Sequence, residues 1–263
     1  MSVVCLTSAH GSPGVTTTAL ALAATWPSHR RCLLVEADLF GGVIAARYGL
    51  GDTPGLSSLA ADSRRGLDDD VVWRHAQYLP GGVPVLVGPA SPDEAHVVLR
   101  DIADALTAWS TEQIEIDVII DCGRIPPGLS TIDTIGEAGV VMVLTRPTLD
   151  QLRPAAHRLG ALNALGIDVG LLLVGDKPYG PAEVTAALQM PVVGIVAWDP
   201  RTAAVLTGAR GSVRDLRRSP LVRSVATLAE RLAPTRPSRP EPGHNTQLAS
   251  LVQPKEQVQE ATS

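Results

Sequence analysis

Residues 3–17, VVCLTSAHGSPGVTT, join an apolar run of strand length to a loop that contains Gly11 and Gly14. An Ala/Leu-rich run that is typical of a helix follows directly, as TALALAAT at residues 18–25. Glycines in such a loop let the backbone turn tightly, so that successive N–H groups at the helix N-terminus point toward one anion. The stretch therefore predicts a strand, an anion-binding loop and a helix, in that order.

Apolar runs of strand length recur along the chain and alternate with stretches of helical pattern. Short, continuous apolar strands separated by helices predict an α/β fold with a doubly wound, mostly parallel sheet and helices on both faces. In such a sheet, ligands bind at the carboxyl ends of the strands. We expect strands at 3–6, 32–35, 83–87, 118–120, 140–144, 170–174 and 192–196. We expect helices at 16–24, 93–109, 151–165, 181–188, 201–206 and 219–232.

The composition predicts one large domain followed by a polar tail. The chain has 263 residues, of which 45% are hydrophobic, and it carries a net charge of −5. This is enough apolar material for a substantial core, and the negative charge does not favour nucleic-acid binding. From residue 234 the chain is rich in Pro, Arg, Ser and Gln, a composition typical of disorder. We therefore expect a domain at 1–233 and a disordered tail at 234–263.

Several features predict a cytoplasmic location. The N-terminus lacks the basic region of a signal peptide, and no apolar stretch reaches the roughly 20 residues that span a bilayer. Cys5, Cys32 and Cys122 lie far apart in apolar surroundings, which favours buried, reduced thiols over a metal site. Residues 201–240 hold nine arginines against two acidic residues, and the expected helix at 219–232 carries an apolar stripe. We expect this helix to pack on the domain, while binding to DNA or peripherally to an anionic membrane remains open.

The loop resembles that of the MinD/ParA family of P-loop ATPases, which reads TSGKGGVGKTT. Other segments resemble the same family in the same order. Residues 32–38 resemble its second strand and first switch, and residues 117–123 resemble its Walker B strand and second switch. Residues 191–199 resemble a late strand whose following loop lines the base pocket. The resemblance implies a P-loop NTPase fold, ATP or ADP with Mg²⁺ as ligands, and a homodimer.

The resemblance also implies roles for individual residues. Asp38 corresponds to the switch carboxylate that orients the attacking water, so it would be catalytic and would also lie at the metal. Asp121 corresponds to the Walker B carboxylate that holds Mg²⁺, usually through water, and the Thr16 hydroxyl would be a further metal ligand. The nucleotide-binding loop would consist of Gly11, Ser12, Gly14, Val15, Thr16 and Thr17.

The loop departs from the family pattern at both of its lysines. Val15 stands where a lysine reaches the β- and γ-phosphates, and His10 stands where the signature lysine reaches the partner's nucleotide. The first lysine of the chain is Lys177. Phosphoryl transfer depends on cations that stabilise the spreading charge, and losing one such contact costs about 10²–10³ in rate. We therefore expect at most weak ATP hydrolysis.

Three functions are compatible with these residues. The favoured one is a regulatory or spatial-organising factor for pilus, secretion, division or partition machinery, acting as a homodimer with protein partners. The second is an active, Mg-ATP-dependent dimer switch with an atypical loop. The third is a partition factor that binds DNA or a membrane surface through residues 201–240. The first is favoured because the acidic residues of the site are kept and the lysines are not.

Overall fold

The computed structural model describes residues 3–11, 13–64, 66–125, 139–208 and 213–233. Within them lies an eight-stranded sheet in the order β3-β4-β2-β5-β1-β6-β7-β8. Only the edge pair of β3 and β4 is antiparallel, so the expected doubly wound, mostly parallel sheet is confirmed. The strands are β1 Val3–Ser8, β2 Arg31–Glu36, β3 Gln77–Tyr78, β4 Pro84–Leu86, β5 Ile116–Arg124, β6 Val140–Thr145, β7 Asp168–Val174 and β8 Val192–Val196.

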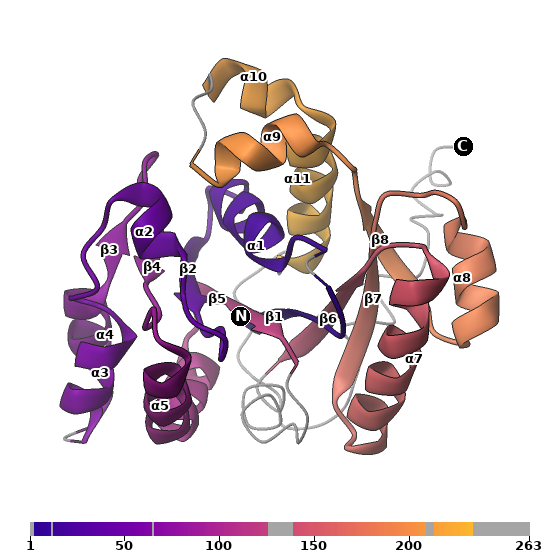
Figure 1. Ribbon diagram of the computed structural model, residues 1–263. Helices are drawn as coiled ribbons and strands as arrows, with labels where there is room; N and C mark the ends of the chain where they lie inside the picture. Colours follow the sequence, from indigo (N-terminus) through magenta and orange to yellow (C-terminus); the bar gives the residue numbers. More distant parts are fainter. Residues whose placement is uncertain (1–2, 12, 65, 126–138, 209–212, 234–263) are drawn as a thin grey trace, which may run out of the picture.

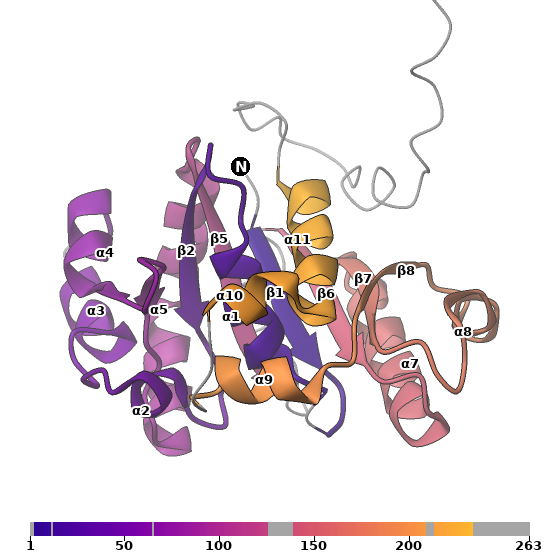
Figure 2. The ribbon, with the colours of Figure 1, turned by 90° about the horizontal axis from the view of Figure 1, so that it is seen from above.

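Helices cover both faces of the sheet, and Figures 1 and 2 show the two layers from the front and from above. One face carries α1 Val15–Ala24, α2 Ile44–Tyr48, α9 Pro200–Leu206, α10 Val213–Arg218 and α11 Pro220–Leu232. The other face carries α3 Leu56–Ser63, α4 Asp69–His75, α5 Pro92–Glu112, α7 Leu149–Ala164 and α8 Pro181–Leu188.

The central strands are buried on both sides, and this explains their continuous apolar sequence. All six residues of β1 are buried. Val3 and Cys5 face the core beneath α5 and α7, while Val4 and Leu6 face the core beneath α1 and α11. Because successive side chains point to opposite faces of a strand, a strand covered on both faces needs apolar residues at every position.

The last helix confirms the expectation that it packs on the domain. Leu221, Val225 and Leu228 of α11 are buried against α1 and β8. The apolar stripe that could have faced a membrane is therefore part of the core. No helix in the described ranges is long and apolar enough to cross a membrane.

The structure differs from the sequence-based expectation at several elements. The strand expected at 118–120 extends over Ile116–Arg124, so Asp121 lies inside β5 and not after it. The strand extends because the polar residues at its end still pair with β1. The strand and helix ranges expected from the sequence do not include the two-residue strand β3 or the helices α2, α3, α4 and α10. Ser12 of the loop and the tail expected at 234–263 lie outside the described residues.

Candidate functional site

The loop after β1 turns at two glycines, as the sequence predicts. Gly14 has a φ of 103° and Gly11 a φ of 66°, both in the left-handed region that glycine adopts without strain. Gly14 is the residue directly before α1. The amide of the Gln151 side chain, at the start of α7, lies so close to Gly11 that a side chain on residue 11 would displace it. Both glycines are therefore required by the local geometry.

The N-terminus of α1 is suited to bind an anion. No side chain caps it among the described residues, and its first turn contains no acidic residue. The first N–H groups of a helix have no partner within the helix, and they carry the positive end of the helix dipole. Val15, Thr16 and Thr17 supply these N–H groups at the start of α1.

The lysine position itself carries no charge. The side chain of Val15 is only 6% exposed, and it packs in the core beneath α1 and α11. The imidazole of His10, which stands at the second lysine position, is exposed to solvent. Val15 can therefore contribute its N–H to a phosphate but no cation.

Asp121 provides a buried carboxylate beneath this helix N-terminus. Its side chain is fully buried, and its Oδ1 accepts a hydrogen bond of 3.1 Å from the Gly123 N–H. Its Oδ2 has no partner at ordinary hydrogen-bond geometry among the described residues, although the Thr16 hydroxyl lies close enough to the carboxylate to act on its pKa. Burial raises the pKa of Asp121 to about 7, although the Thr16 hydroxyl and the Gly123 N–H act to lower it. A buried carboxylate oxygen without a partner is a position where a cation would be stabilised.

Asp38 lies close to Asp121, in the turn after β2. Its Oδ1 accepts a hydrogen bond of 2.8 Å from the Phe40 N–H, and its carboxylate lies against the α-carbon of Gly123. Burial raises the pKa of Asp38, while the Phe40 N–H and the charge of Arg124 act to lower it. The two acids expected at the site, Asp38 and Asp121, are therefore brought together around Gly123.

Glu36, at the end of β2, has a structural role that the sequence did not reveal. Its Oε1 accepts hydrogen bonds from the N–H groups of Val43 (2.6 Å) and Ile44 (2.8 Å), and its Oε2 accepts one from Gly88 (3.0 Å). The residue is buried, and burial raises its pKa in spite of these three bonds. Because both of its oxygens accept hydrogen bonds, Glu36 holds the start of α2 and the loop after β4 against the end of β2.

The arrangement fits a Mg²⁺ ion that arrives with a phosphate. The Thr16 hydroxyl and the carboxylates of Asp121 and Asp38 are oxygen donors, which Mg²⁺ prefers. The observation that indicates a cation site is the buried Oδ2 of Asp121, which lacks a hydrogen-bond partner among the described residues. In the described part of the chain, no three His, Cys, Asp or Glu side chains form a group that could hold a metal alone. In the usual Mg²⁺ site, one or two carboxylates act together with phosphate oxygens and water.

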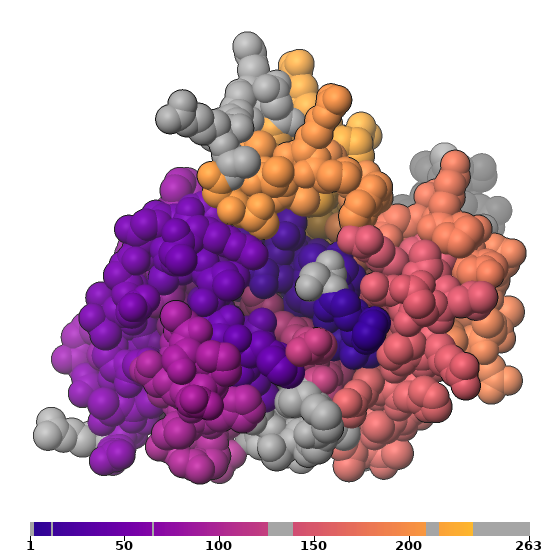
Figure 3. Space-filling model, in the orientation of Figure 1, coloured from indigo at the N-terminus to yellow at the C-terminus, as the bar shows by residue number. Residues whose placement is uncertain are grey.

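Two arginines at the carboxyl ends of the strands are stacked on aromatic rings. The guanidinium of Arg124, at the end of β5, lies 4.2 Å from the centre of the Phe40 ring. The guanidinium of Arg146, after β6, lies 4.1 Å from the ring of Trp198. Phe40 and Trp198 are both exposed, at 42% and 54%. In Figure 3 the indigo N-terminal segment is visible in the middle of this face, between the purple, magenta, orange and pink segments.

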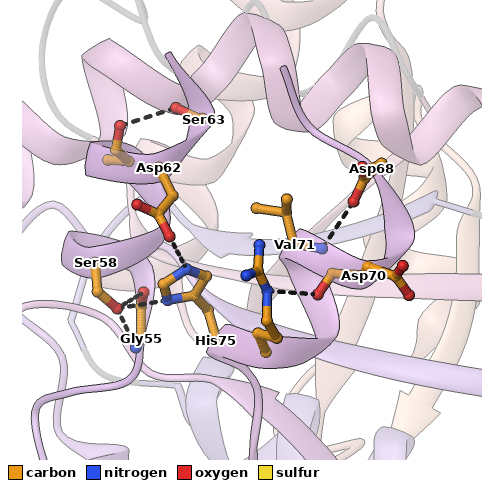
Figure 4. A network of polar contacts seen from close by, with 10 residues as sticks. Gly55, Ser58, Asp62, Ser63, Asp68, Asp70, Val71 and His75 are labelled. Carbon is orange, nitrogen blue, oxygen red and sulfur yellow. Dashed lines mark hydrogen bonds and ion pairs between the residues drawn. The ribbon is translucent and has the colours of Figure 1, made fainter. Parts of the chain in front are cut away.

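A polar network lies elsewhere, between α3 and α4 (Figure 4). The Ser58 Oγ is 2.7 Å from the His75 Nδ1, and the His75 Nε2 is 3.0 Å from the Asp62 Oδ2. The Ser58 Oγ also lies 3.0 Å from both the N and the O of Gly55, so that it closes the first turn of α3. The Asp68 side chain caps α4 by accepting a hydrogen bond from the Val71 N–H. These contacts stabilise the two helix starts and join α3 to α4.

No protein-family model matches the sequence. No curated protein matches it either. Solved structures do match the fold. The ParA family ATPase from Chlorobium tepidum TLS superposes with a TM-score of 0.72 at 17% identity, over 87% of this chain and 97% of that one. The septum site-determining protein MinD from Pyrococcus horikoshii OT3, in complex with Mg-ADP, superposes with a TM-score of 0.68 at 18% identity, over 87% and 94%.

A variant of McdA from Cyanothece, in complex with ATP, superposes with a TM-score of 0.63 at 16% identity, over 89% of this chain and 98% of that one. These matches cover nearly the whole length of the solved chains. The chain therefore has the fold of the MinD, ParA and McdA P-loop ATPases, as the resemblance of its motifs implies.

Proposed function

We propose that this chain is a nucleotide-binding factor that positions other cellular machinery and hydrolyses ATP weakly or not at all. The ligands would be ATP or ADP with Mg²⁺, bound between the loop after β1 and the acids of β2 and β5. The machinery would be a pilus or secretion apparatus, a division site or a partition complex. The observation that carries the proposal is the unpartnered Oδ2 of the buried Asp121 beneath the uncapped N-terminus of α1.

Binding is supported by the parts of the site that remain. The helix N-terminus offers N–H groups to phosphates, and Thr16 and Asp121 offer oxygens to Mg²⁺. Among the proteins with the same fold, one was solved with Mg-ADP and another with ATP. The site of this chain would accept the same class of ligand.

Weak or absent hydrolysis follows from the loss of cations. Val15 is packed in the core, and an exposed histidine, His10, stands at the second lysine position. Without a lysine at the phosphates, the loop stabilises less of the charge that spreads in phosphoryl transfer. The chain would then exchange nucleotide to change its association with itself and with other proteins. We propose a homodimer with protein partners as the working form.

Phosphate release and light scattering test the proposal together. The unmodified chain is incubated with millimolar Mg-ATP or Mg-ADP, beside Asp38→Ala and the exposed control Asp101→Ala. We expect phosphate release no more than slightly above the buffer blank, and a dimer mass that depends on nucleotide. Clear turnover that Asp38→Ala abolishes and Asp101→Ala keeps would instead establish the active dimer switch with an atypical loop.

Binding to DNA or a membrane through residues 201–240 is the less favoured alternative. The apolar stripe of α11 is packed in the core, so it offers no apolar face to lipid. Arg217 and Arg218, at the end of α10, are exposed and could still contact phosphates. Salt-dependent binding to DNA or anionic vesicles that Arg217→Ala/Arg218→Ala removes would favour this alternative.

A further inference from the structure

We propose that Arg124 supplies the positive charge on the nucleotide's phosphates that a loop lysine supplies in the proteins this chain resembles. The inference rests on the proposed function, because it concerns the same site. It assigns the role to a residue at the end of β5, outside the loop. The ligand class it implies is a nucleoside polyphosphate, with Arg124 acting on phosphates beyond the first.

The main chain holds Arg124 beside the start of the loop. Arg124 is the strand partner of Ser8, the last residue of β1. On either side of it, the Thr7 hydroxyl donates to the Gly123 carbonyl (3.0 Å), and the Ile125 N–H donates to the Ser8 carbonyl (2.8 Å). The backbone of Arg124 is thereby fixed to the segment from which the loop leaves the sheet.

The side chain of Arg124 is directed toward the acidic side of the site. Its guanidinium stacks on Phe40, and the Phe40 N–H is bound to the Asp38 carboxylate. The guanidinium therefore lies near Asp38, at the carboxyl ends of the strands, where the loop after β1 begins.

None of the ion pairs recorded among the described residues involves the guanidinium of Arg124; they include Arg30 with Asp117, His75 with Asp62, and Arg100 with Asp101. Arg124 is also exposed, so a ligand can reach it. Stacking on an aromatic ring leaves the N–H groups at the guanidinium's edge available, and their planar fork matches the oxygens of a phosphate.

Arg146 is the competing cation, and its surroundings favour another role. It follows β6, on the opposite side of β1 from Asp38. Its guanidinium stacks on Trp198, after β8, and its Nε is buried and has no hydrogen-bond partner among the described residues. Arg146 therefore faces the β8 side of the site, away from the two acids. Lys177 is exposed after β7, one strand farther from the loop.

Calorimetric titrations with Mg²⁺ and ATP, ADP or AMP test the assignment. They compare the unmodified chain with Arg124→Ala, Arg124→Lys, Arg146→Ala and Arg100→Ala, the last an exposed arginine on α5. We expect Arg124→Ala to weaken ATP binding by about 10- to 100-fold. AMP binding should change by less than about threefold, Arg124→Lys should recover part of the loss, and Arg100→Ala should behave like the unmodified chain. Thermal unfolding of each variant without nucleotide shows that the change is local.

The outcomes separate this inference from the proposed function. If the unmodified chain binds ATP and Arg124→Ala binds it equally well, Arg124 does not act on the phosphates and the inference alone fails. If Arg146→Ala loses the preference for ATP over AMP while Arg124→Ala keeps it, the role belongs to Arg146. If the unmodified chain binds no nucleotide, both the inference and the proposed function fail.

Discussion

The carboxylate of Asp38 lies directly against the α-carbon of Gly123, in space that any side chain on residue 123 would occupy. Gly123 has a φ of 57°, and its N–H is donated to the Asp121 carboxylate. Its carbonyl accepts the Thr7 hydroxyl. One glycine thus joins the acid after β2 to the buried acid of β5. The approach of Asp38 and Asp121 depends on the absence of a side chain between them.

We predict that Gly123→Ala destabilises the fold more than a matched glycine substitution does. Gly49 has a similar φ of 65°, with open space around it. Gly49→Ala should therefore lower the free energy of unfolding only by the cost of holding an alanine in the left-handed conformation, about 1–2 kcal/mol. Gly123→Ala should cost this and also displace Asp38. Urea unfolding of both variants measures the difference, and equal losses would show that the Asp38 contact contributes nothing.

We predict a fall in stability with rising pH that belongs to Asp121. Its pKa in the folded chain is about 7, against about 3.9 for an unfolded aspartate. The folded state therefore holds this proton more tightly, so the contribution to stability is fully present below about pH 3.9 and is lost as the pH rises through about 7. Within that window, the slope from this one group reaches about 1.4 kcal/mol per pH unit.

Asp121→Asn isolates this group, because an amide cannot ionise. Unfolding by denaturant is measured for the unmodified chain and for Asp121→Asn across the same pH range, without Mg²⁺ or nucleotide. The free energy of unfolding of the unmodified chain should fall relative to that of Asp121→Asn as the pH rises. A difference that does not change with pH would show that Asp121 is not buried as described.

We predict that Val15→Lys exchanges stability for nucleotide affinity. Val15 packs in the core, so a lysine there should cost about 1–3 kcal/mol of stability without ligand. Its ammonium would reach the phosphates and raise ATP affinity by about tenfold or more. Val15→Met is the uncharged control of similar length. Calorimetric titration measures the ATP affinity, and thermal unfolding measures the stability. Equal ATP affinity in Val15→Lys and Val15→Met would show that a lysine at residue 15 does not contact the phosphates.

We predict that Glu36→Gln loosens the start of α2. The Glu36 carboxylate accepts hydrogen bonds from all three N–H groups that surround it. In Glu36→Gln, the NH₂ group of the amide would face at least one of these N–H groups, so that two donors would oppose each other. The expected loss is about 1–3 kcal/mol. Glu183→Gln, which alters an exposed carboxylate that accepts the Gly180 N–H, should cost less. Denaturant unfolding tests the pair, and the prediction fails if Glu36→Gln is no more destabilising than Glu183→Gln.

Much of the fold could be predicted from the sequence, because the long strands are buried on both faces. The apolar runs marked β1, β6 and β8 within a few residues, and the alternation with helices indicated the parallel sheet. The two-residue strand Gln77–Tyr78 carries no such signal, because two residues show no periodicity. The end of β5 is polar, so its pairing with β1 could not be seen in the sequence.

The candidate site could be predicted only in part. Gly11, Gly14, Thr16, Asp38 and Asp121 were recognisable because each stands in a motif next to a strand or helix. The role of Glu36 was not, because its partners Val43, Ile44 and Gly88 reach it only through the tertiary fold. The stacking of Arg124 on Phe40 was hidden for the same reason, since β5 and the turn after β2 are distant in sequence.

We infer that a loop without lysine, together with Asp121, still forms a Mg²⁺-dependent nucleotide site. Calorimetric titration of the unmodified chain with ATP, with and without Mg²⁺ and beside Asp121→Ala, tests it most directly. We expect binding that requires Mg²⁺ and is lost in Asp121→Ala, while Asp101→Ala binds normally. Absence of binding at millimolar ATP, or binding that neither Mg²⁺ nor Asp121→Ala affects, would contradict the claim.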